Sequence, residues 1–388
     1  MPSTSLTSPT RPRSRGLFIR VCSVFVLSIC IPPTPAVIAQ PTVPLPAPDT
    51  VLTRIAFGSC AFEDRPQPIW PVIARNRPDL FLFLGDNVYI DKLDGRTRIP
   101  TTRAEFDADY RMLAEIPEFA AFAKTVPFLA TWDDHDFGLN DAGAEFPHKQ
   151  LAQEAFLDFF GVAADSPRRA REGVYHAETF GPPGQRVQII LLDTRYHRSP
   201  LLRSNGPRIP GRGRYMPDPD PTKTMLGDAQ WQWLEDQLKQ PADLRLICSS
   251  IQILAGEHRF ESWINLAAER DRLFQLIADT KAAGVVFLTG DRHLAELSIA
   301  PPTQTPVGYP LHDLTASGLN ETRRPVNEPN RYRHPNPQAV FRQTHYGLLL
   351  IDWDTDAQNP SPTVTLEVRD RLGNPLIQHA VPLATLQP

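Results

Sequence analysis

Short apolar runs alternate with amphipathic segments along most of the chain. The run Leu80-Phe81-Leu82-Phe83-Leu84 contains no polar residue, which fits a strand that is buried on both faces of a sheet. Comparable runs predict six further strands, at 54–57, 128–131, 173–180, 186–192, 244–249 and 285–289. The chain is therefore expected to contain a β-rich core that begins shortly after residue 50.

Segments with helical spacing of their apolar residues separate these strands. They predict helices at 69–75, 103–113, 117–124, 150–160, 226–240 and 262–282. The last part of the chain alternates apolar and polar residues, which predicts strands at 346–352, 363–369 and 375–382. A β–α order that ends in antiparallel hairpins favours an α+β or α/β sandwich of mixed sheets with helices outside. A single domain, 53–388, is the simpler interpretation, because no second linker interrupts it.

The first 39 residues have the pattern of a signal peptide. Four arginines precede or enter an apolar run, 21–31, that is too short for a stable membrane anchor. Small residues at 37 and 39 predict cleavage before Gln40, followed by a proline-rich linker over 40–52. Retention as an uncleaved anchor is the alternative. Cleavage predicts an exported protein, periplasmic or extracellular, with no membrane span.

The net charge of the chain limits the kinds of molecule that it is expected to bind. The chain has a formal net charge of -4, and loss of residues 1–39 would leave 36 basic side chains against 44 acidic ones. An acidic surface disfavours non-specific binding to nucleic acid or anionic lipid. The short basic pieces at 168–171 and 323–324 are better explained as solvated loops. A small-molecule substrate is therefore expected, with no specific nucleic-acid partner, and the oligomeric state stays open.

Polar side chains of unusual chemistry follow four of the apolar strands. The strands at 54–57, 80–84, 128–131 and 285–289 lead into the sequences GSC, GDNVYID, WDDHD and GDRH, respectively. Ligands of α/β proteins bind at the carboxyl ends of strands, so these thiol, carboxylate, phenol and imidazole groups are expected to meet at one edge. Each motif alone is modest, but four coincidences of this kind point to one functional site.

So many carboxylates cannot share a partly buried cleft without compensation. Unpaired burial would raise their pKa values or cost several kcal/mol each. Bound cations remove the conflict: a thiolate with a phenolate suits trivalent iron, while Asp and Asn oxygens suit Ca²⁺, Mg²⁺ or Mn²⁺. A metal pair would also lower the pKa of a bound water and produce a nucleophile.

With these motifs the chain resembles the alkaline phosphatase D (PhoD-like) family of the calcineurin-like metallophosphoesterase superfamily. Further matching pieces are Leu192-Asp193-Thr194-Arg195 and the helix start at 226–234. The resemblance covers roughly residues 53–385. It implies a metallophosphoesterase-like sandwich of two mixed β-sheets flanked by helices, with iron and calcium as cofactors. Other divalent metals remain an alternative.

The resemblance also implies roles for individual residues. Cys60 and Tyr89 would bind iron, and Asp86 would bridge the metals. Asp291 and His293 would complete the calcium side. Asp134 or Asn140 would be the fourth ligand, and His135 would be the acid beside the leaving oxygen. Arg195 would contact either a phosphate oxygen or Asp193. His258 is a further, weaker candidate for the cleft.

Two cysteines, Cys60 and Cys248, would remain in an exported chain and could pair as a disulfide. A disulfide would remove the proposed iron ligand, so the two interpretations exclude each other.

These observations favour an exported hydrolase that cleaves phosphate esters with a metal-activated water. One alternative keeps the site and changes the activity to that of a phosphodiesterase or a phospholipase D-like enzyme. An alternative of another class is a non-catalytic exported protein that binds the metals for structure.

Overall fold

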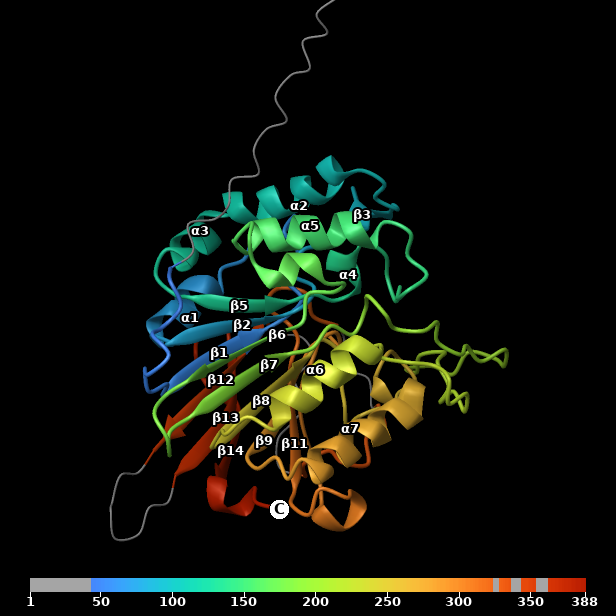
Figure 1. The fold of residues 1–388 in the computed structure, drawn as a ribbon. Helices are drawn as coiled ribbons and strands as arrows, with labels where there is room; N and C mark the ends of the chain where they lie inside the picture. Colours follow the sequence, from blue (N-terminus) through green and yellow to red (C-terminus); the bar gives the residue numbers. More distant parts are fainter. Residues whose placement is uncertain (1–42, 324–327, 336–342, 354–361) are drawn as a thin grey trace, which may run out of the picture. The chain divides into compact units, whose positions relative to one another are not determined.

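The structure, a computed structural model, describes residues 43–323, 328–335, 343–353 and 362–388. Two six-stranded sheets stack in this part of the chain (Figure 1). The first sheet has the strand order β14 (Pro375–Pro382), β13 (Thr363–Asp370), β12 (His345–Asp352), β1 (Arg54–Gly58), β2 (Leu80–Leu84) and β5 (Phe128–Thr131). Strands β1, β2 and β5 run parallel, whereas β12, β13 and β14 pair antiparallel. This sheet is therefore mixed, as the sequence predicted.

The second sheet is also mixed. Its strand order is β10 (Ala295–Ala300), β11 (Leu311–Ala316), β9 (Val285–Thr289), β8 (Leu244–Ser249), β7 (Val187–Leu191) and β6 (His176–Phe180). The four central strands are parallel, and the two edge strands are antiparallel to their neighbours. A small hairpin of β3 (Lys92–Leu93) and β4 (Arg96–Thr97) stands apart from both sheets.

Helices cover the outer faces of the two sheets (Figure 1). The first sheet is covered by α1 (Trp70–Arg75), α2 (Arg103–Glu115), α3 (Pro117–Ala123) and α5 (Lys149–Phe159), with the short α4 (Asp134–Phe137) after β5. The second sheet is covered by α6 (Asp228–Leu238) and α7 (Ala267–Asp279). Short 3-10 turns lie at Pro167–Ala170, Trp263–Leu266, Pro302–Gln304 and Leu383–Thr385. The predicted sandwich of two mixed sheets flanked by helices is confirmed.

Alternation along β2 shows how the sequence produces two cores. All five residues of β2 are buried. Phe81 and Phe83 pack with the aromatic side chains of the covering helices, while Leu80, Leu82 and Leu84 belong to the cluster between the sheets. Successive side chains of a strand point to opposite faces, so an uninterrupted apolar run serves both cores at once.

The sequence placed the four motif-bearing strands at one edge, and this needs a correction. Strands β1, β2 and β5 belong to the first sheet, but β9 belongs to the second. The polar residues therefore come together because the carboxyl ends of parallel strands in two stacked sheets meet. Other differences are β10, β11 and the short β3 and β4, which have no counterpart among the predicted strands. Buried polar residues weaken the apolar signal of a strand, namely Glu296 and Ser298 in β10 and His312 and Asp313 in β11.

The predicted signal peptide, 1–39, lies outside the described residues, as does the start of the linker. Within the part that the structure describes, no helix combines the length and apolar character needed to cross a bilayer.

Candidate metal centre

The backbone at the strand ends adopts a conformation that is rare for residues other than glycine. Cys60, Asp86, Asp291 and His293 all have positive φ angles, between 49° and 65°. Non-glycine residues in this left-handed region carry a cost and are found mainly at functional sites. Between them, Gly85 lies so close to the next strand end that an added Cβ would approach the Cβ of Asp133 to 2.4 Å. The strand ends are thus turned sharply and packed tightly, which aims their side chains at one point.

One side of this site contains a thiol and a phenol as candidate metal ligands. The Sγ of Cys60 lies 3.3 Å from Oδ2 of Asp86 and 3.1 Å from Oγ of Ser317. The hydroxyl of Tyr89 lies 3.4 Å from the same carboxylate oxygen and 3.2 Å from Nε2 of His293. Burial, with a smaller contribution from the charge of Asp291, raises the pKa of the Cys60 thiol to about 11. Burial likewise raises the pKa of Tyr89 well above its ordinary value.

The other side is a cluster of buried carboxylates. Single oxygens of Asp86, Asp133, Asp134 and Asp291 lie within 4.8 Å of one another. Burial and neighbouring negative charge raise the pKa of Asp86, and burial raises that of Asp291 to about 7. Among the described residues, Oδ1 of Asp134 and Oδ2 of Asp133 are buried without a hydrogen-bond partner. Such orphaned oxygens beside a thiol and a phenol are a donor set that fits bound cations.

His135 lies against this cluster and is held by Asp91. Its Nδ1 is 2.6 Å from Oδ1 of Asp91, and its ring packs on the ring of Tyr89 with 4.2 Å between centroids. Burial lowers the pKa of His135, but the charges of Asp134 and Asp91 outweigh this effect and raise it overall. The backbone N–H of Asn140 donates to the second oxygen of Asp91. Asp91 therefore links two residues that the sequence had proposed for the site.

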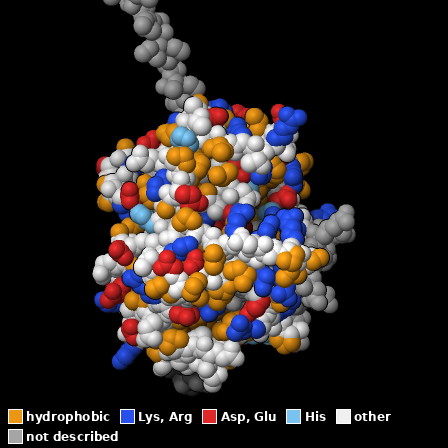
Figure 2. All heavy atoms as spheres, turned by 90° about the vertical axis from the view of Figure 1, so that its right-hand side faces the viewer, with side chains coloured by type: hydrophobic (Ala, Val, Ile, Leu, Met, Phe, Trp, Pro, Cys, Tyr) orange, Lys and Arg blue, Asp and Glu red, His pale blue; other side chains and the backbone are white. Residues whose placement is uncertain are grey.

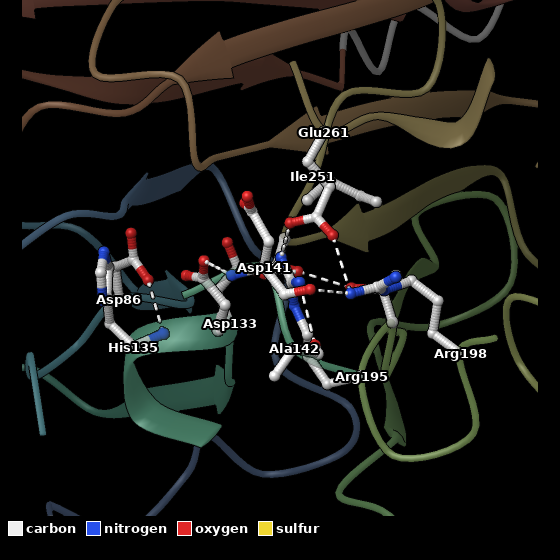
Figure 3. A network of polar contacts seen from close by, with 12 residues as sticks. Asp86, Asp133, His135, Asp141, Ala142, Arg195, Arg198, Ile251 and Glu261 are labelled. Carbon is white, nitrogen blue, oxygen red and sulfur yellow. Dashed lines mark hydrogen bonds and ion pairs between the residues drawn. The ribbon is translucent and has the colours of Figure 1, made fainter. Parts of the chain in front are cut away.

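Arg195 lies elsewhere than the sequence predicted. Its side chain is fully buried and does not line the cavity. Its guanidinium binds Oδ1 of Asp133 and Oε2 of Glu261, and Arg198 binds the other oxygen of Glu261 (Figure 3). Only its backbone N–H contacts Asp193. With its donors committed to two buried carboxylates, Arg195 is placed to hold Asp133 behind the cluster, and the predicted contact with phosphate is not supported.

A cavity of about 230 Å³ opens over the cluster. Asp134, His135, Asn140, Asp291 and His293, all proposed from the sequence, contribute to its lining. Cys60, Asp86 and Tyr89 lie below it and are buried. The thiol and phenol side is therefore shielded from solvent, whereas the opposite side of the cluster is open to a ligand.

Sequence reasoning missed several residues of this cavity. Asp141 and Glu261 line it and form a further acidic group with Asp134. Burial and the charge of Glu261 raise the pKa of Asp141 to about 6. Asp141 directly follows Asn140 in the sequence, which is a weak signal that it belongs to the site. Nothing in the sequence around Glu261 indicates that it lines the cavity. The loop at 203–215 also contributes to the wall.

The structure also bears on two further hypotheses from the sequence, one on His258 and one on a disulfide between Cys60 and Cys248. His258 is buried, accepts a hydrogen bond from the backbone N–H of Phe260 and does not line the cavity. Burial lowers its pKa well below the ordinary value. Cys60 and Cys248 are both free thiols, so the alternative in which they form a disulfide is wrong for this structure.

Comparison with known proteins agrees with this geometry. Residues 55–359 match a model of the family described as PhoD-like phosphatase. Alkaline phosphatase D of Bacillus subtilis (strain 168) is 26% identical over 291 residues, which cover 65% of this chain and 48% of that protein. The chain thus spans about half the length of the curated relative that it matches.

Two solved structures share the fold. One, described as the structure of PhoD, has a TM-score of 0.62 at 18% identity and covers 86% of this chain and 74% of that one. The other is GAP50, the anchor in the inner membrane complex of Plasmodium, with a TM-score of 0.50 at 14% identity. The second match covers 86% of this chain and 89% of that one. At these identities the likeness concerns the fold alone.

Proposed function

Because the chain belongs to the PhoD-like phosphatase family, we propose that it is a metal-dependent phosphoric ester hydrolase. The observation that carries this proposal is the cluster of buried carboxylates with orphaned oxygens at the floor of an open cavity. Buried acids of this density require compensating positive charge. Metals placed there would be reachable by a phosphate group, whereas structural metal sites are normally closed.

The donor chemistry suggests which residues hold which metal. Cys60 and Tyr89 would hold iron(III), because thiolate and phenolate suit that ion, and Asp86 lies between them and the other acids. Asp291 and His293, with Asp134 or Asn140, would hold calcium. When bound, the metals would supply a hydroxide nucleophile near neutral pH and neutralise the phosphate oxygens.

The protein's own contribution to the chemistry is positioning and proton transfer. His135 lines the cavity, and Asp91 fixes its ring. An imidazole held in this way can give a proton to the leaving oxygen. The backbone N–H of His135 also donates to Asp86, which ties the acid to a carboxylate that would help to hold the metals. Asp133, fixed by Arg195, supports the cluster from behind.

The proposal extends to the organisation of the chain. Residues 1–39 would be a signal peptide, 40–52 a linker and 53–388 the catalytic domain. The catalytic domain would then act in the periplasm or outside the cell on small phosphate esters. N-terminal sequencing of the protein recovered from the exported fraction tests this arrangement, and a first residue of Gln40 is the expected result.

Metal analysis combined with an ester assay tests the activity. The purified protein should contain iron and calcium, hydrolyse p-nitrophenyl phosphate and lose activity on chelation. Asp86→Ala and Asp291→Ala should lose metal and turnover, while Asp236→Ala, at an exposed position on α6, should behave as wild type. Full activity in either cluster variant would overturn the two-metal site.

The same assay separates the alternatives. Preferential hydrolysis of bis(p-nitrophenyl) phosphate or of a phospholipid would identify a phosphodiesterase or a phospholipase D-like enzyme. Bound metal with no turnover of any ester would identify a non-catalytic metal-binding protein.

A further inference from the structure

Arginine side chains gather at the mouth of the cavity, opposite its acidic floor. Six arginines contribute to the lining, and four of them lie within a single loop: Arg203, Arg208, Arg212 and Arg214. In Figure 1 the chain around residues 200–220 projects to the right, and Figure 2 views the molecule from that side. Lys and Arg side chains are concentrated across the middle of this face in Figure 2.

The loop has a fixed base. Its two ends pair with each other, since Ser204 N–H donates to the carbonyl of Arg214 at 2.7 Å and Met216 N–H donates to that of Leu202 at 2.9 Å. Backbone closure of this kind defines a compact Ω-type loop. Prolines at 207 and 210 restrict its backbone further. The arginines are therefore carried on a closed and stiffened segment.

The loop is also docked beside the carboxylate cluster. The hydroxyl of Tyr215 donates to Oδ2 of Asp141 at 2.7 Å, and the backbone N–H of Asp141 donates to Asp134 at 2.6 Å. Gly213 packs so tightly that an added Cβ would lie 2.0 Å from the carbonyl oxygen of Arg259. Through these contacts the loop is connected to Asp134, one of the proposed metal ligands.

Among the described residues, only one of the loop's four arginines has a carboxylate partner: Arg203, which also donates to the hydroxyl of Tyr215 at 2.7 Å. Arg203 approaches Asp141 at 3.7 Å, and Arg214 donates to the carbonyl of Ser204. Arg208 and Arg212 form no side-chain ion pair or hydrogen bond with any residue that the structure describes. Glu261, which also lines the cavity, is already engaged, since it binds two buried arginines.

Guanidinium groups that have no protein partner and lie at the mouth of a proposed phosphate-hydrolysing centre are available to an anionic ligand. Like charges held together repel, and an arginine fork binds phosphate oxygens in a bidentate manner. The reacting phosphate would lie on the acidic floor with the metals, so it cannot also occupy the loop. We propose that the 202–216 loop is a binding site for a second phosphate group of the substrate.

The proposal rests on the proposed hydrolase function and makes it more specific: the preferred substrates are low-molecular-weight organic bisphosphates. A long polyanion is disfavoured, because the cavity measures only about 230 Å³ and the chain as a whole is acidic, with a net charge of -4.

A matched pair of substrates tests the proposal. Adenosine 3′,5′-bisphosphate and adenosine 3′-monophosphate share the 3′-phosphate ester and differ only in the 5′-phosphate. Cleavage is counted as release of the 3′-phosphate alone, which converts the bisphosphate to adenosine 5′-monophosphate. Wild-type protein should show a kcat/KM about tenfold or more higher for the bisphosphate, as expected for charge-assisted contacts. The preference should decrease as salt is added, since exposed charges are screened.

Variants locate the effect in the loop. The double variant Arg208→Ala/Arg212→Ala should lose the preference, whereas Arg208→Lys/Arg212→Lys should retain part of it. Arg111→Ala, an exposed position on α2 away from the cavity, is the matched control and should keep the full ratio. Thermal unfolding of each variant establishes that it is folded.

Each negative outcome has its own meaning. A wild-type ratio near one, a ratio unchanged in the double alanine variant, or faster cleavage of an oligonucleotide overturns the bisphosphate site. Absence of turnover on both nucleotides and on p-nitrophenyl phosphate instead contradicts the hydrolase function. Calorimetric binding of the same two nucleotides then decides the loop's role, because equal affinities would overturn the proposal without any catalysis.

Discussion

The imidazole of His135 and the carboxylate of Asp91 form a buried pair, with 2.6 Å between Nδ1 and Oδ1. Asp91 comes from the segment after β2, and His135 belongs to α4 after β5, so the pair joins two neighbouring strand ends. The contact fixes the ring and favours the protonated imidazole, because a carboxylate stabilises the positive charge.

Replacing Asp91 tests this pair. Asp91→Asn should reduce kcat about 10- to 100-fold, the size seen when a partner that orients an active-site histidine is removed. Its iron and calcium content should be unchanged. In the pH–activity profile, the decrease in activity at high pH should also move to lower pH, because the neutral amide no longer raises the pKa of His135. Asp94→Asn, exposed in the β3–β4 hairpin, is the control, and an unaltered pH profile in Asp91→Asn would contradict the role.

Removal of Arg195 is expected to act on stability. Its loss would leave Asp133 buried without its cation, whereas Glu261 would keep Arg198 as a partner. Breaking a buried pair in this way costs about 3–5 kcal/mol of the free energy of unfolding. Urea denaturation of Arg195→Met in the metal-loaded protein measures the loss, and Arg195→Lys should recover part of it. Normal stability with a raised KM would instead mean that Arg195 contacts the substrate.

Metal removal should make the stability depend on pH. Without cations, burial raises the pKa of Asp291 to about 7 and that of Glu63 to about 8. The carboxylate of Glu63 accepts a hydrogen bond from the backbone N–H of Tyr89. A group with a raised pKa in the folded state favours folding at low pH, and its contribution is lost as pH rises through that pKa. Chelated protein should therefore lose stability between about pH 4 and pH 8.

Thermal unfolding across this range checks the expectation. Metal-loaded protein should lose much less, because the cations compensate the ionised Asp291. Glu63→Gln should make the curve of the chelated protein less steep, since it removes one of the acids whose pKa burial raises. A chelated protein that becomes more stable as pH rises would contradict the pKa directions.

The sulfur and phenol ligands give a spectroscopic prediction. If Cys60 and Tyr89 bind iron(III), the purified protein should be coloured by charge transfer from these ligands, and Cys60→Ser and Tyr89→Phe should each alter the visible spectrum. Cys248→Ala is the matched control, since Cys248 is an equally buried free thiol in β8. Iron binding with an unchanged spectrum in both variants would place the iron elsewhere.

Local pattern was sufficient for much of the fold. The apolar run at 80–84 matches β2 residue for residue, because a strand buried on both faces requires apolar side chains at every position. Strands β5, β8 and β9 also coincide with the predicted ranges. The polar residues after these strands marked the site, since a short segment between a strand and the next element leaves few places for its side chains. Such features depend on neighbours in sequence.

Relationships between distant segments were decided only by the packing of the two sheets. Asp291 reaches Asp86 because β9 of one sheet ends where β2 of the other ends, although about two hundred residues separate them in sequence. The sequence proposed two partners for the Arg195 side chain, whereas packing gave it Asp133 and Glu261. The contact of Tyr215, in the 202–216 loop, with Asp141 joins segments 74 residues apart, and nothing local in the sequence indicates it. Sequence thus determined which groups stand at the strand ends, and tertiary structure decided which of them meet, because that depends on how two separately formed sheets stack.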